Sequence, residues 1–193
     1  PEIALAEIDR VRAAGVRFSC VLADAGFGSS PAFRHGLDER ELAWAAGIAG
    51  TQLVYPTTVK LRPACTPTGR PAKHKRPNRP PRTAAEMLAT QRWRRLTWRT
   101  GTKGPLNAAG TRLPGAELWL IGEWRDSSEK KYHLSSLPKR TSLRRLVASV
   151  KARWSCEQVH HQLKQELGLG DFEGRSWTGL HRHALMTCIA FAY

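Results

Sequence analysis

The chain has 193 residues, 31 of them Lys or Arg and 16 Asp or Glu, so its formal net charge is +15. That length suits one domain with a core of its own and would be cramped for two. Hydrophobic residues make up 41% of the chain, which argues against a wholly disordered protein. No apolar run reaches the ~18 residues of a membrane span. The cysteines form no C-x-x-C pair, so they indicate neither a zinc ribbon nor a disulfide scaffold and favour a cytoplasmic location: Cys20, Cys65, Cys156 and Cys188.

The first third of the sequence alternates between helical and extended patterns. Apolar residues at helical spacing predict a helix over residues 3–15, and the apolar segment 16–24 predicts a buried strand that ends at Asp24. Ser30 followed by Pro31 is typical of a helix start. The remaining patterns predict a helix over 30–41 and short strands over 42–50 and 51–57.

The rest of the chain predicts further strands and then helices. A short helix is expected over 84–91, and an antiparallel meander is expected from strands at 93–100, 116–124 and 130–137. This order predicts a mixed α/β domain with a β-rich insertion over 56–138. Because the chain does not begin with Met and ends inside an apolar helical pattern, we expect a piece of a longer protein.

Two helices are predicted at the C-terminal end. Residues 142–167 read as one long helix, and a last helix runs from Leu180 to the C-terminus. The long helix carries an apolar stripe that should face the sheet, made of Leu143, Leu146, Val147, Val150 and Trp154.

Most of the positive charge lies in one segment. Residues 60–103 hold 13 basic residues and a single acid, whereas residues 1–59 hold 5 basic and 7 acidic residues. Residues 56–82 also contain 7 of the 12 prolines, which excludes a helix or an inner strand and predicts an extended, mobile loop over 60–82. A solvated insertion and a phosphate-binding arm suit this composition about equally. The candidate phosphate-binding residues here are Lys73, Lys75, Arg76, Arg79 and Arg82.

The segment that follows mixes cations with aromatic residues and favours the nucleic-acid interpretation. Its cations are Arg92, Arg94, Arg95, Arg99 and Lys103, of which the last four are the candidate DNA-binding residues, and Trp93, Leu96 and Trp98 lie among them. A strand that faces a polyanion is expected to have this pattern, whereas a solubility tail has no need of tryptophan. Double-stranded DNA is therefore the leading partner class.

Two acidic residues are candidates for chemistry. Asp24 follows the most apolar predicted strand, and ligands of open α/β sheets bind at the carboxyl ends of strands. Taken alone, however, a turn-capping role for Asp24 is favoured roughly two to one. Glu157 shares one helical stripe with Arg153 and Lys164. On spacing alone this stripe is better explained as a surface ion pair with a nearby lysine.

Several segments resemble bacterial insertion-sequence transposases of the DDE type. The C-terminal segment from Val147 to Tyr193 resembles their C-terminal part, and three shorter stretches match in the right order: VLADAGFGSSPAFRHGL, WRTGTKGPL and YHLSSLP. A subgroup carries the signature Tyr-x2-Arg-x3-Glu-x6-Lys. Arg153, Glu157 and Lys164 keep its spacing, and Val150 stands where the tyrosine would be.

The resemblance implies an RNase H-like fold, with a mixed sheet, flanking helices and a β-rich insertion. It also implies that Asp24 and Glu157 are the second and third acids of a catalytic triad, and that Arg153 and Lys164 contact DNA near the scissile bond. The first acid would lie on an upstream strand. Only Asp9 precedes Asp24 among the aspartates, and it lies in a helical pattern, so we expect the N-terminal strands and the first acid to be missing.

The implied chemistry is the cutting and joining of transposon ends with two Mg²⁺ ions, which the carboxylates would hold. Transposon ends and target DNA would be the partners, together with self-association in a transposition complex at the nucleoid. Without the first acid, metal binding is expected to be weak or absent and the chain inactive alone. The alternatives are a non-catalytic basic DNA-binding protein and a functionless remnant of a transposase.

Overall fold

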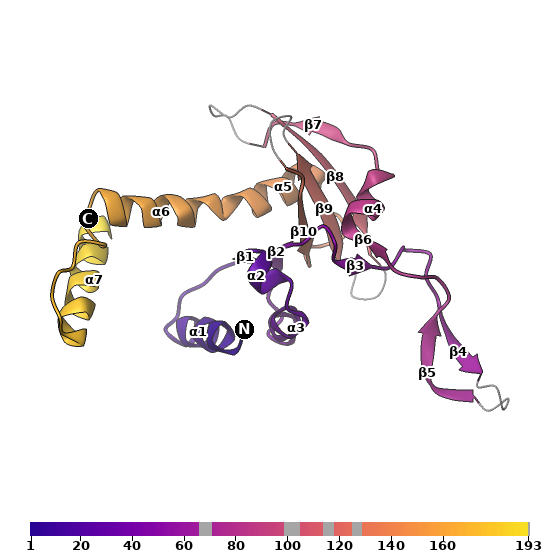
Figure 1. Ribbon diagram of the computed structural model, residues 1–193, viewed down its shortest axis with the longest axis horizontal. Coiled ribbons are helices and arrows are strands. Elements are labelled where there is room, and N and C mark those ends of the chain that lie inside the picture. The colour runs from indigo at the N-terminus through magenta and orange to yellow at the C-terminus, as the bar shows by residue number, and fades with distance from the viewer. Residues whose placement is uncertain (66–70, 99–104, 114–117, 125–128, 193) are drawn as a thin grey trace. The chain divides into compact units, whose positions relative to one another are not determined.

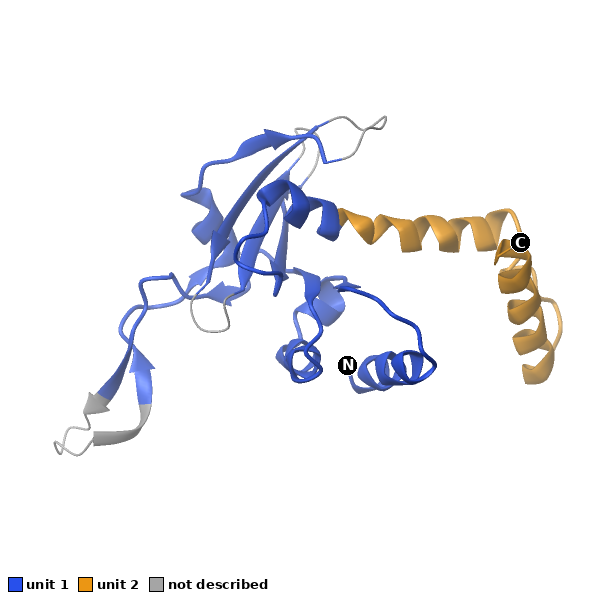
Figure 2. Ribbon diagram, turned by 180° about the vertical axis from the view of Figure 1, so that it is seen from behind, with its two compact units in different colours: residues 1–150 blue, residues 151–193 orange. Residues whose placement is uncertain are grey.

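The computed structural model describes residues 1–65, 71–98, 105–113, 118–124 and 129–192. The chain divides into two compact units, Pro1–Val150 and Lys151–Tyr193 (Figure 2). None of the helices in the described part of the chain is long and apolar enough to cross a membrane.

The first unit is built on a sheet whose six described strands lie in the order β1-β2-β10-β9-β8-β7 (Figure 1). β1 and β2 pair in parallel, and every other neighbouring pair in this sheet is antiparallel. The sheet is therefore mixed, as the sequence predicts, and it is consistent with an RNase H-like arrangement. Its strands are β1 (Val21–Ala23), β2 (Trp44–Ile48), β7 (Arg94–Leu96), β8 (Leu106–Arg112), β9 (Trp119–Trp124) and β10 (Lys131–Ser135).

Strand β2 joins the two halves of this sheet. All five of its residues are buried, as expected for a strand with a neighbour on each side and cover on both faces. The Trp44 backbone N–H donates to Ser136 Oγ (2.9 Å), and its carbonyl accepts from Ser135 Oγ (2.9 Å). The Trp44 indole N–H donates to Asp38 (2.8 Å). These bonds satisfy the polar groups that burial of the tryptophan takes away from water.

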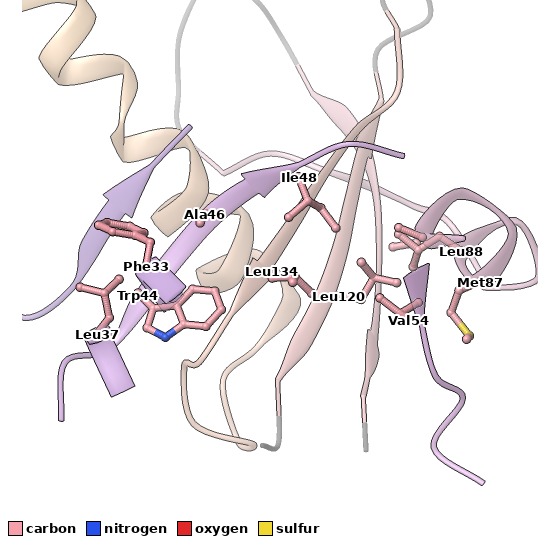
Figure 3. Close-up of a cluster of buried hydrophobic side chains, with 12 residues drawn as sticks. Phe33, Leu37, Trp44, Ala46, Ile48, Val54, Met87, Leu88, Leu120 and Leu134 are labelled. Atoms are coloured by element: carbon pink, nitrogen blue, oxygen red, sulfur yellow. The ribbon is translucent and has the colours of Figure 1, made fainter. Parts of the chain in front are cut away.

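Helices cover both faces of the sheet. Adjacent strand residues point to opposite faces, and Leu120 and Ile121 accordingly belong to different hydrophobic clusters. One cluster contains Leu37 of α3 (Pro31–Glu39) and Leu88 of α4 (Ala84–Ala89), together with strand residues (Figure 3). The other contains Leu146 of α5 (Leu143–Ala152).

The first helix and the third helix pack against each other. α1 (Glu2–Ala13) lies beside α3, where a Cβ on Gly36 would approach Leu5 Cδ1 to 2.4 Å. Ser30 caps α3 by accepting from the Phe33 N–H (3.3 Å), and Pro31 occupies the first turn. Both features of this start were predicted from the sequence.

The Pro-rich basic segment contains strands where the sequence predicts a loop. β4 (Leu61–Cys65) and β5 (Pro71–Pro77) pair antiparallel, and so do β3 (Leu53–Val54) and β6 (Arg82–Thr83). Both are two-stranded sheets, so every strand in them has a free edge. Proline is compatible with such an edge, where no backbone N–H is required. The composition thus excludes an inner strand but not an edge strand.

The long helix predicted over residues 142–167 is interrupted at Arg153. α5 ends at Ala152, and α6 (Trp154–Gln165) begins two residues later. The Cys156 N–H donates to the Arg153 carbonyl (3.0 Å), a bond three residues back that is tighter than the α-helical pattern. The predicted stripe packs on the sheet at Leu146 and Val147, but Trp154 is 42% exposed.

The second unit consists of α6, the segment after it and α7 (Trp177–Ala192). His183 of α7 bonds through Nε2 to the Gly168 carbonyl (2.9 Å), and its ring lies tilted against that of Phe172 with the centroids 5.5 Å apart. Thr187 of α7 is buried, whereas Leu185 and Met186 are exposed.

A substitution at Gly28 tests how closely the short helix α2 (Ala25–Gly28) packs on β2. A Cβ there would meet the Gly47 carbonyl oxygen at 1.9 Å and Ala46 Cβ at 2.8 Å. The backbone cannot rotate away as a side chain could, so Gly28→Ala should lower the free energy of unfolding by about 1–3 kcal/mol in a urea titration. Gly170→Ala is the matched control, because nothing lies within 4 Å of a Cβ there. Equal stability of the two variants would contradict this packing.

Candidate functional site

Asp24 lies immediately after β1, at the carboxyl end of the strand. It caps α2, and its Oδ1 accepts from the Phe27 N–H (3.2 Å). The side chain is exposed, and among the described residues its second oxygen has no protein partner. The capping role that the sequence favours is therefore present, and one carboxylate oxygen is left to face solvent.

The backbone around Asp24 is held by close packing on β2. A Cβ on Gly47 would meet the Ala25 nitrogen at 3.0 Å and the Asp24 carbonyl carbon at 3.2 Å. The Arg34 guanidinium of α3 also donates to the Gly28 carbonyl. Glycine at positions 28 and 47 thus lets α2 lie directly on the strand. The exposed carboxylate is therefore carried on a fixed backbone.

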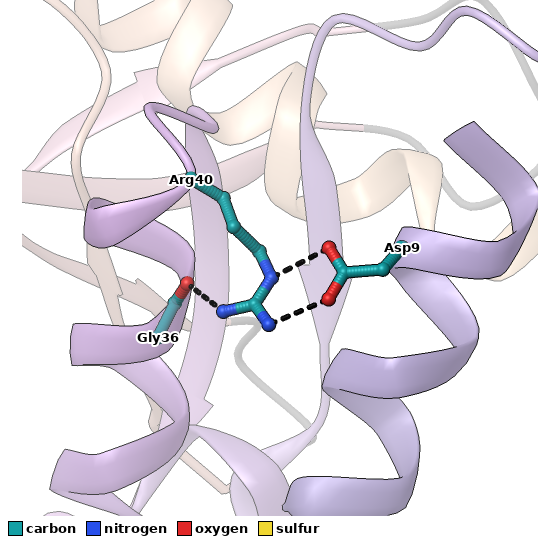
Figure 4. Close-up of polar contacts among 3 residues, drawn as sticks. All are labelled: Asp9, Gly36 and Arg40. Carbon is teal, nitrogen blue, oxygen red and sulfur yellow. Dashed lines mark hydrogen bonds and ion pairs between the residues drawn. The ribbon is translucent and has the colours of Figure 1, made fainter. Parts of the chain in front are cut away.

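Asp9, the other aspartate near the N-terminus, belongs to a structural ion pair. Its two carboxylate oxygens accept from Arg40 Nε (2.8 Å) and Nη2 (2.6 Å), and Arg40 Nη1 donates to the Gly36 carbonyl (2.7 Å) (Figure 4). The hydrogen bond from Arg40 holds the pKa of Asp9 below its ordinary value. Asp9 therefore ties α1 to α3 and is not a candidate metal ligand.

Glu157 lies in the first turn of α6, in the second unit. Its Oε1 accepts from the Arg153 guanidinium, and the glutamate side chain is 55% exposed. Lys164 lies in the last turn of the same helix and is exposed. An i,i+4 pair of this kind contributes only tenths of a kcal/mol. The acid near the helix start and the lysine near its end also complement the helix dipole.

The two candidate acids belong to different units, Asp24 to the first and Glu157 to the second. Among the described residues, no group of three or more His, Cys, Asp or Glu side chains could hold a metal ion.

The predicted DNA-binding residues fall in three groups. Lys75, Arg76, Arg79 and Arg82 are exposed on or beside β5 and β6, and Arg94 and Arg95 are exposed on β7 at the edge of the large sheet. Lys73 lies in β5, but its side chain is outside what the structure describes. Arg99 and Lys103 lie outside the described residues.

The tryptophans beside β7 have a structural explanation that the sequence did not provide. Trp93 packs over Gly122, where a Cβ would meet its ring at 2.7 Å, and its indole N–H donates to the Leu88 carbonyl (3.2 Å). Lys130 lies over the Trp93 ring at 5.5 Å and over the Trp124 ring at 5.6 Å. Trp93 therefore supports the sheet, and Trp98 packs against the second hydrophobic cluster. Among the described residues of this segment, the exposed arginines are left to support DNA binding.

A polar pair on neighbouring strands, with a buried glutamate and a partly buried histidine, was also missed from the sequence. Glu123 of β9 is 5% exposed, and His133 Nε2 of β10 lies 3.9 Å from its Oε1. No spacing motif identifies this pair, because the two residues meet only through the register of β9 and β10.

Comparison with known families identifies one match. Residues 1–105 match the model of a family described as DDE superfamily endonuclease, so the match includes Asp24, β2 and the basic hairpin. No curated protein matches the chain.

Replacement of Arg40 tests the role of Asp9. Arg40→Gln should raise the pKa of Asp9 toward its ordinary value, measured by NMR titration of the carboxyl carbon, because the main hydrogen bond is removed. A depressed pKa stabilises the fold above the unfolded-state value, and this stability is lost as pH falls through the folded-state value. Arg40→Gln should therefore be less stable than the parent near neutral pH, and the part of this difference that comes from the ion pair should be absent below the folded-state pKa of Asp9.

Arg12→Gln is the control for this experiment, because Arg12 gives only the weakest of the effects that lower the pKa of Asp9. An Asp9 pKa that is the same in Arg40→Gln and in the parent would contradict the assignment.

Proposed function

Because the chain belongs to the DDE superfamily endonucleases, we propose that it is a transposase domain that cuts and joins the ends of an insertion sequence. In this proposal Asp24 and Glu157 are two of the carboxylates of the catalytic site. The substrate is double-stranded DNA. It includes the transposon end that is cut and the target DNA to which that end is joined.

The observation that carries the proposal is the setting of Asp24. Its carboxylate follows a strand of a mixed sheet, is exposed, and sits on a backbone fixed by contact of α2 with Gly47. A fixed backbone with an exposed carboxylate suits catalysis, because the group need not be reorganised when the substrate binds. A capping aspartate needs only one of its oxygens, and the other remains available.

The donor set fits Mg²⁺. Asp24 and Glu157 each use one oxygen in a local hydrogen bond, to Phe27 and to Arg153 respectively. The remaining carboxylate oxygens are the type of ligand that Mg²⁺ prefers. When bound, a pair of such ions would supply activation of a water or a 3′-hydroxyl and stabilisation of the leaving oxygen.

The cations of α6 have positioning roles in this proposal. Arg153 orients Glu157 through their ion pair, and its own charge attracts a phosphate. Lys164 is exposed on the same helix and would contact the DNA backbone. Both residues would fix the position of the DNA strand, and the chemical step would take place at the carboxylate site.

A further carboxylate is needed to complete a site of three. Asp9 cannot supply it, because both of its oxygens are held by Arg40. Asp9 is also the only aspartate that precedes Asp24, and we propose that the third acid comes from a segment outside these 193 residues, so that the chain alone does not cleave. A chain that binds duplex DNA but gains no cleavage from any added segment would instead be a non-catalytic DNA-binding derivative.

The acids are tested in a chain extended by an upstream segment that carries a strand-borne aspartate. Metal-dependent cleavage of a labelled transposon end should be lost in Asp24→Asn and in Glu157→Gln, by about 10³-fold or more, because the charge in the transition state loses its support. Calorimetric titration with Mn²⁺ should show weaker binding in both variants. Duplex binding without metal should be unchanged.

Matched controls are Asp171→Asn and Glu166→Gln, both exposed acids of the second unit. These controls should cleave like the parent. Full cleavage by Asp24→Asn or by Glu157→Gln would remove that acid from the proposed site.

The basic segment of residues 94–103 is tested by the salt dependence of DNA binding. Replacing Arg94, Arg95, Arg99 and Lys103 with Ala should weaken binding to any duplex and flatten the slope of log affinity against log salt by about 0.9 for each phosphate that the protein no longer neutralises. Arg12→Ala with Arg17→Ala is the control, since both arginines are exposed and near the N-terminus. A slope equal to that of the parent would place these four residues away from the DNA.

A further inference from the structure

The β4–β5 hairpin is a narrow two-stranded ribbon with a well-defined base. Lys60 and Asn78 close it: the Asn78 N–H donates to the Lys60 carbonyl (2.9 Å), and the Lys60 N–H donates to Asn78 Oδ1 (2.7 Å). The strands next to this base, β3 and β6, connect to the core through Val54, which is 6% exposed and belongs to the first hydrophobic cluster (Figure 3). The base of the ribbon is therefore fixed to the core of the first unit.

The register of the ribbon sorts its side chains onto two faces. Arg62 lies directly opposite Arg76, and Pro63 lies opposite Lys75. Because directly opposite residues share a face and neighbours alternate, the two arginines lie on one face and Lys75 lies on the other. These four side chains are all exposed.

This arrangement is unfavourable for an isolated hairpin. Like charges directly opposite each other are destabilising, and a two-stranded hairpin without a packed face is marginally stable in water. The sequence offers no neutralising acid nearby, since no Asp or Glu occurs between Glu41 and Glu86. A polyanionic partner would remove this penalty.

We propose that the β4–β5 ribbon lies in the major groove of duplex DNA, with the face of Arg62 and Arg76 toward the base edges. The major groove, ~12 Å wide, admits a two-stranded ribbon without distortion, whereas the minor groove, ~6 Å wide, must first be widened by bending of the DNA. The guanidinium groups match the two acceptors of guanine, N7 and O6. The exposed cations at the base, Lys60 and Arg79, would then contact the phosphates that border the groove.

This inference rests on the proposed DNA substrate and deepens it, and it does not depend on the metal site. The probe is a 30-bp duplex with both G·C and A·T pairs, treated with dimethyl sulfate, which methylates guanine N7 in the major groove and adenine N3 in the minor groove. The parent chain should protect guanine N7 and leave adenine N3 reactive.

The matched pair of variants is Arg76→Ala and Lys75→Ala. Each removes one positive charge from adjacent positions of the same strand, but from opposite faces. Arg76→Ala and the double variant R62A/R76A should lose the guanine protection and bind a guanine-containing duplex about tenfold or more weakly. Lys75→Ala should keep the protection, with at most a flatter salt slope.

Three outcomes would overturn the inference: protection of adenine N3 in place of guanine N7, equal footprints for Arg76→Ala and Lys75→Ala, or an R62A/R76A footprint equal to that of the parent. Far-UV circular dichroism checks that the variants are folded. Asp24→Asn separates this result from the catalytic proposal, since it should keep the footprint whether or not the metal site is assigned correctly.

Discussion

The pairing of β2 with β10 is the constraint on which the first unit depends. These strands are separated by more than 80 residues of sequence, and their register places Ala46 opposite Leu134 and Ala45 opposite Ser135. Trp44 fixes that register through its bonds to Ser135 and Ser136. Because β2 also pairs in parallel with β1, the same strand joins the segment that carries Asp24 to the antiparallel strands β7 to β10. Loss of this pairing would separate the two halves of the sheet.

The small residues of β2 connect this constraint to the candidate chemistry. Gly47 has no side chain, so the backbone of α2 lies directly against the strand, and the Asp24 carboxylate is fixed without being buried. The basic hairpin likewise carries exposed charge on an anchored backbone, because its base is attached to the core through β3, β6 and the capped start of α4. In both places a rigid scaffold carries exposed charge. Such a combination suits a protein that must hold a polyanion in one position.

The sequence predicts best those elements whose signals are local. Ser30 with Pro31 marks the start of α3, because a cap and a first-turn proline act within one turn. β8 was missed, because its buried Ala108 and Ala109 carry little strand propensity and depend on pairing with β9. The interruption at Arg153 was missed, since its backbone remains helical and only the hydrogen-bond pattern changes. The Glu123–His133 pair could not be predicted, because strand register creates it. The position of Asp24 at the end of a strand was predicted, because strand ends are visible in sequence.

The central proposal is that Asp24 and Glu157 hold the same metal site. It is tested most directly by adding Mn²⁺ in small steps to the isotopically labelled chain, extended by the upstream segment that supplies the third acid, and following its amide NMR signals, since paramagnetic broadening detects even weak binding. The account predicts that signals around Asp24 and signals around Glu157 broaden together, that Mg²⁺ reverses both effects, and that Asp24→Asn abolishes both. Broadening around one acid alone, or broadening around Glu157 that persists in Asp24→Asn, would contradict it.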